Sequence, residues 1–451
     1  MNVVNLQPQA APGQTERREN VPCLSPSPPL EERAKGEEAA LASTLNSQLS
    51  TTVSVSLLTG GGDKPYALGL ASALTAQGVS LDFIGSDDLD VPELRNDPRV
   101  CFLNLRGDQT EQASLGRKTF RIVKYYGRLI WYAATGRPRI FHILWNNKFE
   151  LFDRTVLLLF YKALGKKLVF TAHNVNAGKR DGNDSWVNRL TLRIQYKLVD
   201  HILVHTQKMK EQLQAGFGVP ESRVTIIPFG INNTIPVTRL SAGEAKQRLG
   251  IQPHDKIALF FGQIAPYKGL EYLVAAMAEL GKTSREVRLI IAGKVKKGFE
   301  NYWGKIQAMI QSAGVRERII ERIAHIPDSD VELYFKAADV LVLPYIHIFQ
   351  SGLPFLAYNF GLPVIAADVG SLREDIIEGR TGFVCQPRDP AHLASRMETY
   401  FSSELYQQLE TRRQEIRDFS NERHSWVKAG EITNRVYHNL VTQCSSLKPC
   451  T

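Results

Sequence analysis

The feature that most restricts the fold of this chain is a repeated unit of buried strand, small-residue turn and helix between Phe335 and Phe383. The apolar runs Val340–Leu343 and Pro363–Ala366 are typical of strands that are buried on both faces of a parallel sheet. A turn rich in Gly and Ser follows each run, and then a helix-compatible segment. Because helices must cover both faces of such a sheet, this stretch predicts an α/β domain.

The same alternation of strand and helix extends over most of the chain, which predicts two α/β domains. Strands are expected at six places before residue 228: Val53–Leu58, Val79–Ile84, Arg139–Leu144, Lys167–Thr171, His201–Val204 and Val224–Ile227. The turn-rich stretch Pro228–Ser241 is expected to link this series to a second one that starts at Lys256. We therefore assign residues 51–235 to a first domain, 236–405 to a second, and 406–451 to C-terminal helices.

Residues 1–50 differ in composition from the rest and are expected to form a disordered tail. They are rich in Pro, Ser, Gln, Glu and Ala and nearly free of aromatic residues. The chain has a net charge of +9, and since residues 1–50 contribute −2, the remainder carries +11. A basic body favours an anionic partner: nucleic acid, a membrane surface or a phosphorylated substrate.

Cysteine usage and hydropathy bear on the location of the protein. The five cysteines are scattered without metal-ligand spacing, which suits a reducing cytoplasm. No apolar run reaches the length of a membrane span, and the N-terminus lacks the pattern of a secretory signal. A cytoplasmic protein is expected, with or without peripheral contact to the inner face of the membrane.

Two loops of the second domain are suited to binding an anion. Gln350-Ser351-Gly352 would place backbone N–H groups at the start of a helix that runs from Ser351 to about Asn359. In the segment Phe260–Leu280, a strand delivers Lys268-Gly269 to the head of another helix. A simple helix cap is the alternative for either loop alone, but two such loops in one domain indicate a phosphorylated ligand.

Six motifs of the second domain, taken in order, resemble a known family. They are Gly262…Lys268-Gly269, Ile290–Gly293, Ala338-Asp339-Val340, Gly361–Val364, Gly370…Glu374 and Gly379…Thr381-Gly382. Together they look like the nucleotide-sugar domain of retaining glycosyltransferase family 4, the group 1 glycosyltransferases, over about Lys256–Met397. A weaker resemblance covers Val53–Pro228. The resemblance as a whole implies the GT-B fold, in which two Rossmann-like domains have parallel sheets that face each other across a cleft. It also implies a last helix that crosses back to the first domain.

The resemblance also implies where a nucleotide-diphosphate sugar binds. Lys268 would stabilise the departing diphosphate, whereas the alternative for any one lysine is a solvated loop position. The other expected donor-binding residues are Gly262, Gly293, Gln350, Ser351, Gly352, Leu353 and Glu374.

The sequence departs from the family pattern at two places. No Arg precedes Lys268 in the loop that starts at Gly262, so phosphate binding would depend more on Lys268. The usual Glu-x7-Glu positions fall at about Ile348 and Leu356. Gln350-Ser351-Gly352 takes the place of the first acid, a pattern that resembles one branch of the family and leaves the sugar and ribose contacts open.

In the first domain, Gly60-Gly61-Gly62 and His173 are the candidate acceptor-side residues. The glycines follow the first strand, where side chains would block a ligand, although a tight turn is the alternative. His173 and Asn174 follow the strand Lys167–Thr171, at the strand end where α/β ligands bind. The alternative for His173 is a structural role. His201 and His205 are interpreted as structural residues.

Residues 117–148 predict a basic helix with aromatic flanks. The segment contains eight Lys and Arg, seven aromatic residues and no acid. At 100° per residue one stripe holds Arg117, Arg121, Lys124 and Arg128, with Trp131 beside it, whereas Ile122, Leu129 and Ile130 face the opposite side. Such a helix fits an anionic membrane surface, or it buries one side and solvates the other. Nucleic acid is not expected, because no recognised module accompanies it.

These features predict a glycosyltransferase that acts on a lipid-linked or polysaccharide-precursor acceptor, with retention of anomeric configuration. No cofactor or metal is expected, since GT-B enzymes generally work without one. The pairs Asp88/Asp90 and Asp328/Asp330 are interpreted as a turn and a helix start. A non-catalytic GT-B-like subunit, or another GT-B enzyme such as a nucleotide-sugar epimerase, stays open as the alternative.

Overall fold

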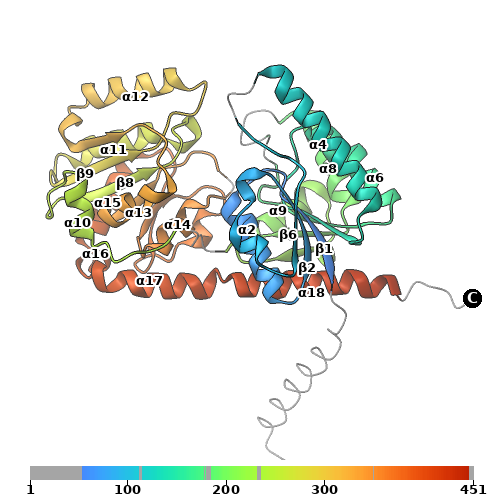
Figure 1. Cartoon of the computed structure of the whole chain (residues 1–451). Helices are drawn as coiled ribbons and strands as arrows, with labels where there is room; N and C mark the ends of the chain where they lie inside the picture. The colour runs from blue at the N-terminus through green and yellow to red at the C-terminus, as the bar shows by residue number, and fades with distance from the viewer. Residues whose placement is uncertain are drawn as a thin grey trace, which may run out of the picture. The chain divides into compact units, whose positions relative to one another are not determined.

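The computed structural model describes residues 53–110, 114–176, 178, 184–230, 235–348 and 350–445. The expected N-terminal tail of residues 1–50 lies outside the described residues, as do residues 231–234 of the expected linker. Thr52–Thr451 form one compact unit, and its described residues contain two separate parallel sheets (Figure 1). The α/β class and the two parallel sheets expected from the alternating pattern are confirmed.

The first sheet has seven strands in the order β3-β2-β1-β4-β5-β6-β7, all pairing in parallel. Its strands are β1 Ser54–Leu58, β2 Ser80–Gly85, β3 Val100–Asn104, β4 Ile140–Ile143, β5 Lys167–Thr171, β6 His201–Val204 and β7 Val224–Ile226. In the centre, Leu57 of β1 lies between Phe83 of β2 and His142 of β4. All three are fully buried, as expected for a sheet that is covered on both faces.

The second sheet has six parallel strands in the order β10-β9-β8-β11-β12-β13. They are β8 Lys256–Phe261, β9 Val287–Ala292, β10 Ile319–Arg322, β11 Val340–Leu343, β12 Val364–Ala367 and β13 Gly382–Cys385. The order changes direction between β8 and β11. In open α/β sheets, ligands bind beyond the carboxyl ends of the strands at such a point.

Helices connect consecutive strands and cover the sheets (Figure 1). Those around the first sheet are α2 Lys64–Ala76, α3 Pro92–Arg95, α4 Leu115–Thr135, α5 Glu150–Phe152, α6 Leu158–Ala163, α8 Trp186–Leu198 and α9 Gln207–Phe217. Those that follow are α10 Ala242–Arg248, α11 Leu270–Leu280, α12 Glu300–Ser312, α13 Asp328–Ala337, α14 Leu353–Asn359, α15 Pro390–Ser402, α16 Glu404–Gln407, α17 Leu409–Arg423 and α18 Trp426–Ser445.

Three apolar cores hold these layers together. One core joins α4, α6, α8 and α9 to the first sheet, and a second joins α2 and α18 to the same sheet. The third and largest surrounds the second sheet. Each large apolar side chain that is fully buried in them contributes roughly 1.5–3 kcal/mol.

The last two helices contact both halves of the compact unit. α17 packs against α14 of the second half, and α18 packs against α2 of the first half. Tyr437 of α18 lies within 2.6 Å of His142 Nδ1 in β4, where both side chains are buried. Since a buried polar pair costs free energy when one partner is removed, this hydrogen bond favours one position for α18.

Candidate functional site

Lys268 is the centre of the candidate donor site. It ends the short 3-10 turn η4 Pro266–Lys268, which follows β8 and precedes α11. Only 6% of Lys268 is exposed, and its Nζ donates a hydrogen bond to the carbonyl oxygen of Phe261 at 3.2 Å. Nζ also lies 5.6 Å from the ring centre of Tyr345.

Burial lowers the pKa of Lys268 to about 8. The structure pairs its ammonium group with no carboxylate among the described residues. A buried cation without a counter-ion is costly. An anionic ligand at this position would offset that cost, so the environment of Lys268 suits a phosphate group.

Gly262 lies beside the Lys268 ammonium group, and Gly293 and Leu353 lie beside Gly262. A Cβ on Gly262 would lie 2.8 Å from Lys268 Nζ and 3.9 Å from Leu353. A Cβ on Gly293 would lie 2.1 Å from the carbonyl oxygen of Gly262, and Gly293 has φ +145°, where side chains are rarely tolerated. The structure therefore brings Gly262, Lys268, Gly293 and Leu353 together at the carboxyl ends of β8 and β9.

The Gln350–Gly352 turn reaches the same cluster through Tyr345. Burial raises the pKa of the Tyr345 hydroxyl group, and the nearby Ser351 side chain offsets part of this shift. Ser351 Oγ accepts a hydrogen bond from the Leu353 amide at 3.3 Å, and α14 begins at Leu353 rather than at the expected Ser351. Both polar atoms of the Gln350 amide are buried without a hydrogen-bond partner among the described residues. They are available to a ligand.

The remaining donor-side positions have partners of their own. Glu374 is half-buried in η6 Leu372–Asp375, where its carbonyl oxygen accepts a hydrogen bond from Arg423 at 2.7 Å. Its neighbour Asp375 is buried, which raises the pKa of that carboxyl to about 8. Leu356 is buried in the core of the second half, and Ile348 packs against that core. Apolar residues therefore stand at the two positions where the family pattern has acids.

The triglycine loop of the first half allows close packing against Trp145 and Arg106. A Cβ on Gly60 would lie 2.1 Å from the Trp145 carbonyl oxygen, and one on Gly62 would lie 2.0 Å from the Trp145 ring. A Cβ on Gly61 would lie 2.5 Å from an Arg106 Nη atom. No other residue type fits this loop without rearrangement, as expected for close approach of backbone and side chain.

His173 stacks on the same tryptophan. The rings of Trp145 and His173 are parallel, with centres 4.2 Å apart, and Tyr66 contacts His173 edge-on at 4.5 Å. His173 Nε2 is buried without a partner among the described residues, and burial lowers the pKa of this histidine well below its usual range. A neutral ring can orient a hydroxyl group but adds no charge. Asn174 Oδ1 accepts the amide of Asn176 at 3.0 Å, which closes a local turn.

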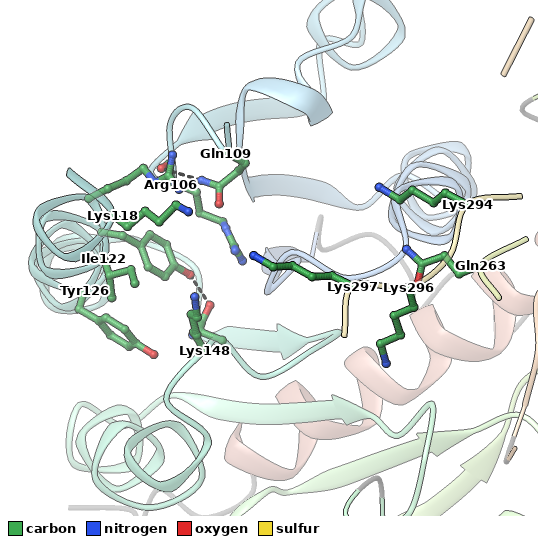
Figure 2. A pocket seen from close by; sticks show the side chains of 13 residues that line it. Arg106, Gln109, Lys118, Ile122, Tyr126, Lys148, Gln263, Lys294, Lys296 and Lys297 are labelled. Carbon is green, nitrogen blue, oxygen red and sulfur yellow. Dashed lines mark hydrogen bonds between the residues drawn. The ribbon is translucent and has the colours of Figure 1, made fainter. Parts of the chain in front are cut away.

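A basic pocket of about 550 Å³ opens between the loops of the two halves (Figure 2). Its residues follow β3, β4, β8 and β9, or belong to α4, and none of these lining residues is acidic. The cations of the first half are Arg106, Lys118, Arg121 and Lys148, and those of the second half are Lys294, Lys296 and Lys297. Figure 2 shows Lys297 extending toward the side chains of the first half.

Of these pocket cations, only Arg121 was expected from the sequence to contact a partner, as part of a membrane-facing stripe. A signal for three others was present, because the run Lys294-Val295-Lys296-Lys297 directly follows the strand that ends near Gly293. The other expected membrane residues, Arg117, Lys124, Arg128 and Trp131, are exposed on α4.

The two Asp-x-Asp strings lie in a turn and at the start of a helix. Asp90 forms an ion pair with Arg95, and Asp328 and Asp330 lie in the first turn of α13. Among the described residues, no group of three or more His, Cys, Asp and Glu side chains could hold a metal ion. Within the same residues, no helix is both long and apolar enough to span a bilayer.

Comparison with known proteins gives two family matches. Residues 241–418 match the family model of glycosyl transferases group 1, and residues 60–234 match that of glycosyltransferase family 4. Over 354 residues the chain is 25% identical to D-inositol 3-phosphate glycosyltransferase of Corynebacterium glutamicum (strain R), which covers 75% of this chain and 83% of that relative.

Solved structures share the fold at low sequence identity. Sucrose-phosphate synthase from Thermosynechococcus elongatus matches with a TM-score of 0.68 at 18% identity, over 87% of this chain and 100% of that one. HepE from Anabaena, in complex with UDP-glucose, matches with a TM-score of 0.63 at 17% identity, over 88% of this chain and 100% of that one.

The fold is therefore the GT-B fold of glycosyltransferases. Within that class, the second half of the chain is similar to group 1 glycosyl transferases, and the first half is similar to glycosyltransferase family 4.

Proposed function

We propose that this protein transfers a sugar from a nucleoside-diphosphate donor to a lipid-linked or polysaccharide-precursor acceptor, with retention of the anomeric configuration. The observation that carries the proposal is Lys268, a buried cation with no counter-ion among the described residues, beside Gly262, Gly293 and the Ser351 turn. The family matches and the UDP-glucose complex of HepE support a nucleotide-sugar donor.

In this proposal Lys268 acts on the leaving group. Negative charge grows on the diphosphate as the bond to the sugar breaks, and a fixed ammonium group stabilises that charge best where water is excluded. Ser351 and the unpartnered amide of Gln350 supply further polar contacts to the phosphates or the sugar. Because these groups already provide cationic and polar contacts, we propose that donor binding needs no metal ion.

The first half of the chain would hold the acceptor. His173 and the Gly60–Gly62 loop lie at the carboxyl ends of β5 and β1, with Trp145 between them. We propose that neutral His173 orients the attacking hydroxyl group by a hydrogen bond through its free Nε2.

Peripheral binding to the cytoplasmic face of a membrane is part of the proposal. Phe120 and Trp131 of α4 are 67% and 70% exposed, beside exposed Arg117, Lys124 and Arg128. Exposed apolar side chains among basic ones suit the interface of an anionic bilayer, where each basic group contributes about 1 kcal/mol. The double variant Phe120→Ser/Trp131→Ser should therefore sediment less with anionic vesicles than the unchanged protein. Equal sedimentation of both would refute this part.

Donor binding and turnover are tested with a panel of nucleotides. Thermal shift with UDP, GDP and ADP should identify one nucleoside diphosphate that stabilises the protein, by a free energy that grows with the logarithm of the ligand concentration over Kd. The matching nucleotide-sugar should then release that diphosphate in the presence of acceptor, and NMR of the product gives the anomeric configuration. Stabilisation by none of the three nucleotides would contradict the proposal.

One observation favours a second candidate, a non-catalytic GT-B-like subunit. Ile348 and Leu356 contribute to the apolar core where the resemblance would expect two acids, so the sugar and ribose contacts would differ from the family pattern. The same assay separates the candidates. Tight nucleotide binding without turnover for any donor and acceptor would favour the subunit.

A further inference from the structure

None of the described residues that line the basic pocket is acidic, so nothing among them neutralises its positive charge. Seven cations line it, and one of them, Arg121, lies 3.9 Å from the carboxylate of exposed Asp108. One Nη atom of Arg106 is buried without a hydrogen-bond partner among the described residues. Like charges gathered in one hollow repel one another, and a buried N–H without an acceptor is unfavourable, so both features indicate a missing anion.

The walls of the pocket are fixed on the side of the first half. Arg106 lies over the ring of Tyr125, 5.4 Å from its centre, and rests against the Gly61 backbone. The Tyr125 hydroxyl group donates a 2.6 Å hydrogen bond to Asn147 Oδ1. These contacts hold the guanidinium group in one place, which suits recognition of a planar or tetrahedral oxyanion by several N–H groups.

The position of the pocket connects it to both expected substrates. Gln263 lines the pocket and directly follows Gly262, the glycine beside Lys268. On the other side, Arg106 contacts Gly61, whose neighbour Gly62 packs on the Trp145 ring that stacks on His173. A molecule in the pocket therefore lies next to the donor cluster and next to the expected site of the attacking hydroxyl group.

We propose that this pocket binds a phosphate or diphosphate group of the acceptor. The inference rests on the proposed function, because it treats Lys268 as the partner of the donor diphosphate. The four cations of the first half would hold the acceptor group, and Lys297 would reach it from the second half (Figure 2). Acceptor binding would thus draw the loops after β3, β4 and β9 together around one anion.

The test uses inorganic pyrophosphate as the probe. It is titrated calorimetrically into the full-length protein saturated with the nucleoside diphosphate found in the nucleotide panel. The double variant Lys118→Gln/Lys297→Gln removes one pocket cation from each half. The double variant Lys197→Gln/Lys305→Gln removes the same charge from exposed positions outside the pocket.

Pyrophosphate should bind the nucleotide-saturated protein, and the pocket variant should bind it at least tenfold more weakly, a loss of about 1.4 kcal/mol. The control variant should bind within twofold of the unchanged protein. Absence of binding, binding only in the absence of nucleotide, or an equal loss in both variants would overturn the proposal. If no nucleotide binds, the proposed function fails separately, and the same comparison on the free protein still decides the pocket.

Two further arms separate the sources of the phosphate. Glucose 1-phosphate in solution and a polyprenyl diphosphate in neutral phosphatidylcholine vesicles each compete against pyrophosphate. Displacement by either supports the proposal and assigns the acceptor to a soluble or a lipid-linked class. Displacement by neither overturns it.

Discussion

Replacement of Lys268 by Met should raise the stability of the protein while it removes the activity. Burial lowers the pKa of Lys268 from 10.5 to about 8. At 1.36 kcal/mol per pH unit, keeping this group charged costs the folded state about 3 kcal/mol at pH 7. Met removes that cost but leaves the Phe261 carbonyl oxygen without its 3.2 Å partner, a loss of about 1 kcal/mol. The free energy of unfolding of Lys268→Met should therefore exceed that of the unchanged protein by about 2 kcal/mol.

The pH dependence of this gain has a definite sign. Below pH 8 Lys268 is charged in both the folded and the unfolded state, so the full penalty is present in the unchanged protein. Between pH 8 and 10.5 the folded state loses the proton first, and the penalty fades. Urea unfolding at pH 7 should therefore show the gain, and unfolding near pH 10 should show little of it.

Lys246 provides a matched control for the same substitution. It is also 6% exposed, but its Nζ forms an ion pair with buried Asp339 at 3.2 Å. Lys246→Met should destabilise the protein by about 3–5 kcal/mol, because it leaves the Asp339 carboxylate buried and unpaired. A loss of stability in Lys268→Met similar to that in Lys246→Met, or donor turnover within tenfold of normal in Lys268→Met, would refute the reasoning.

Further predictions concern the pH, the glycines and the histidine. Nucleoside-diphosphate affinity should fall up to tenfold per pH unit above 8, because Lys268 loses its proton there. Calorimetric titration of Lys268→Met should show no such fall. Gly293→Ala should abolish nucleotide binding, since its Cβ would lie 2.1 Å from the Gly262 carbonyl oxygen, whereas Gly298→Ala meets nothing within 4 Å and should cost only roughly 1–2 kcal/mol. His173→Gln should lower turnover roughly tenfold or more at unchanged donor affinity. In the unchanged protein, the pH–rate profile should show no limb near 6.5, because burial keeps His173 neutral.

The sequence predicted the sheets well where strands are buried on both faces. Lys167–Thr171 and Val340–Leu343 have the expected bounds, since continuous apolar runs between turns leave few alternatives. The strand Val100–Asn104 was not predicted, because it lies at the sheet edge and is half-exposed, so its side chains carry no strong pattern. α14 starts two residues later than expected because the Ser351 side chain accepts from the Leu353 amide and Pro354 favours the first helical turn.

The site was harder to predict where it depends on packing between distant segments. The helical repeat placed Ile130 with the apolar side of α4, yet it is 37% exposed, because a repeat cannot show how much of an apolar arc the sheet covers. The basic pocket joins Arg106 to Lys297 across nearly two hundred residues. Only the convergence of four strand ends brings these charges together. Lys268, in contrast, follows from a local motif, because a strand-to-helix turn positions its own lysine, and its role in donor binding stays a prediction.

The central claim is that a diphosphate binds between the Lys268 ammonium group and the Ser351 turn. A crystal structure of the protein with the nucleoside diphosphate selected by thermal shift tests this claim most directly. We expect the distal phosphate within about 3 Å of Lys268 Nζ, above Gly262 and beside Ser351. A diphosphate bound elsewhere, for example among Arg106, Lys118 and Lys297 with Lys268 still directed only at Phe261, would contradict the account.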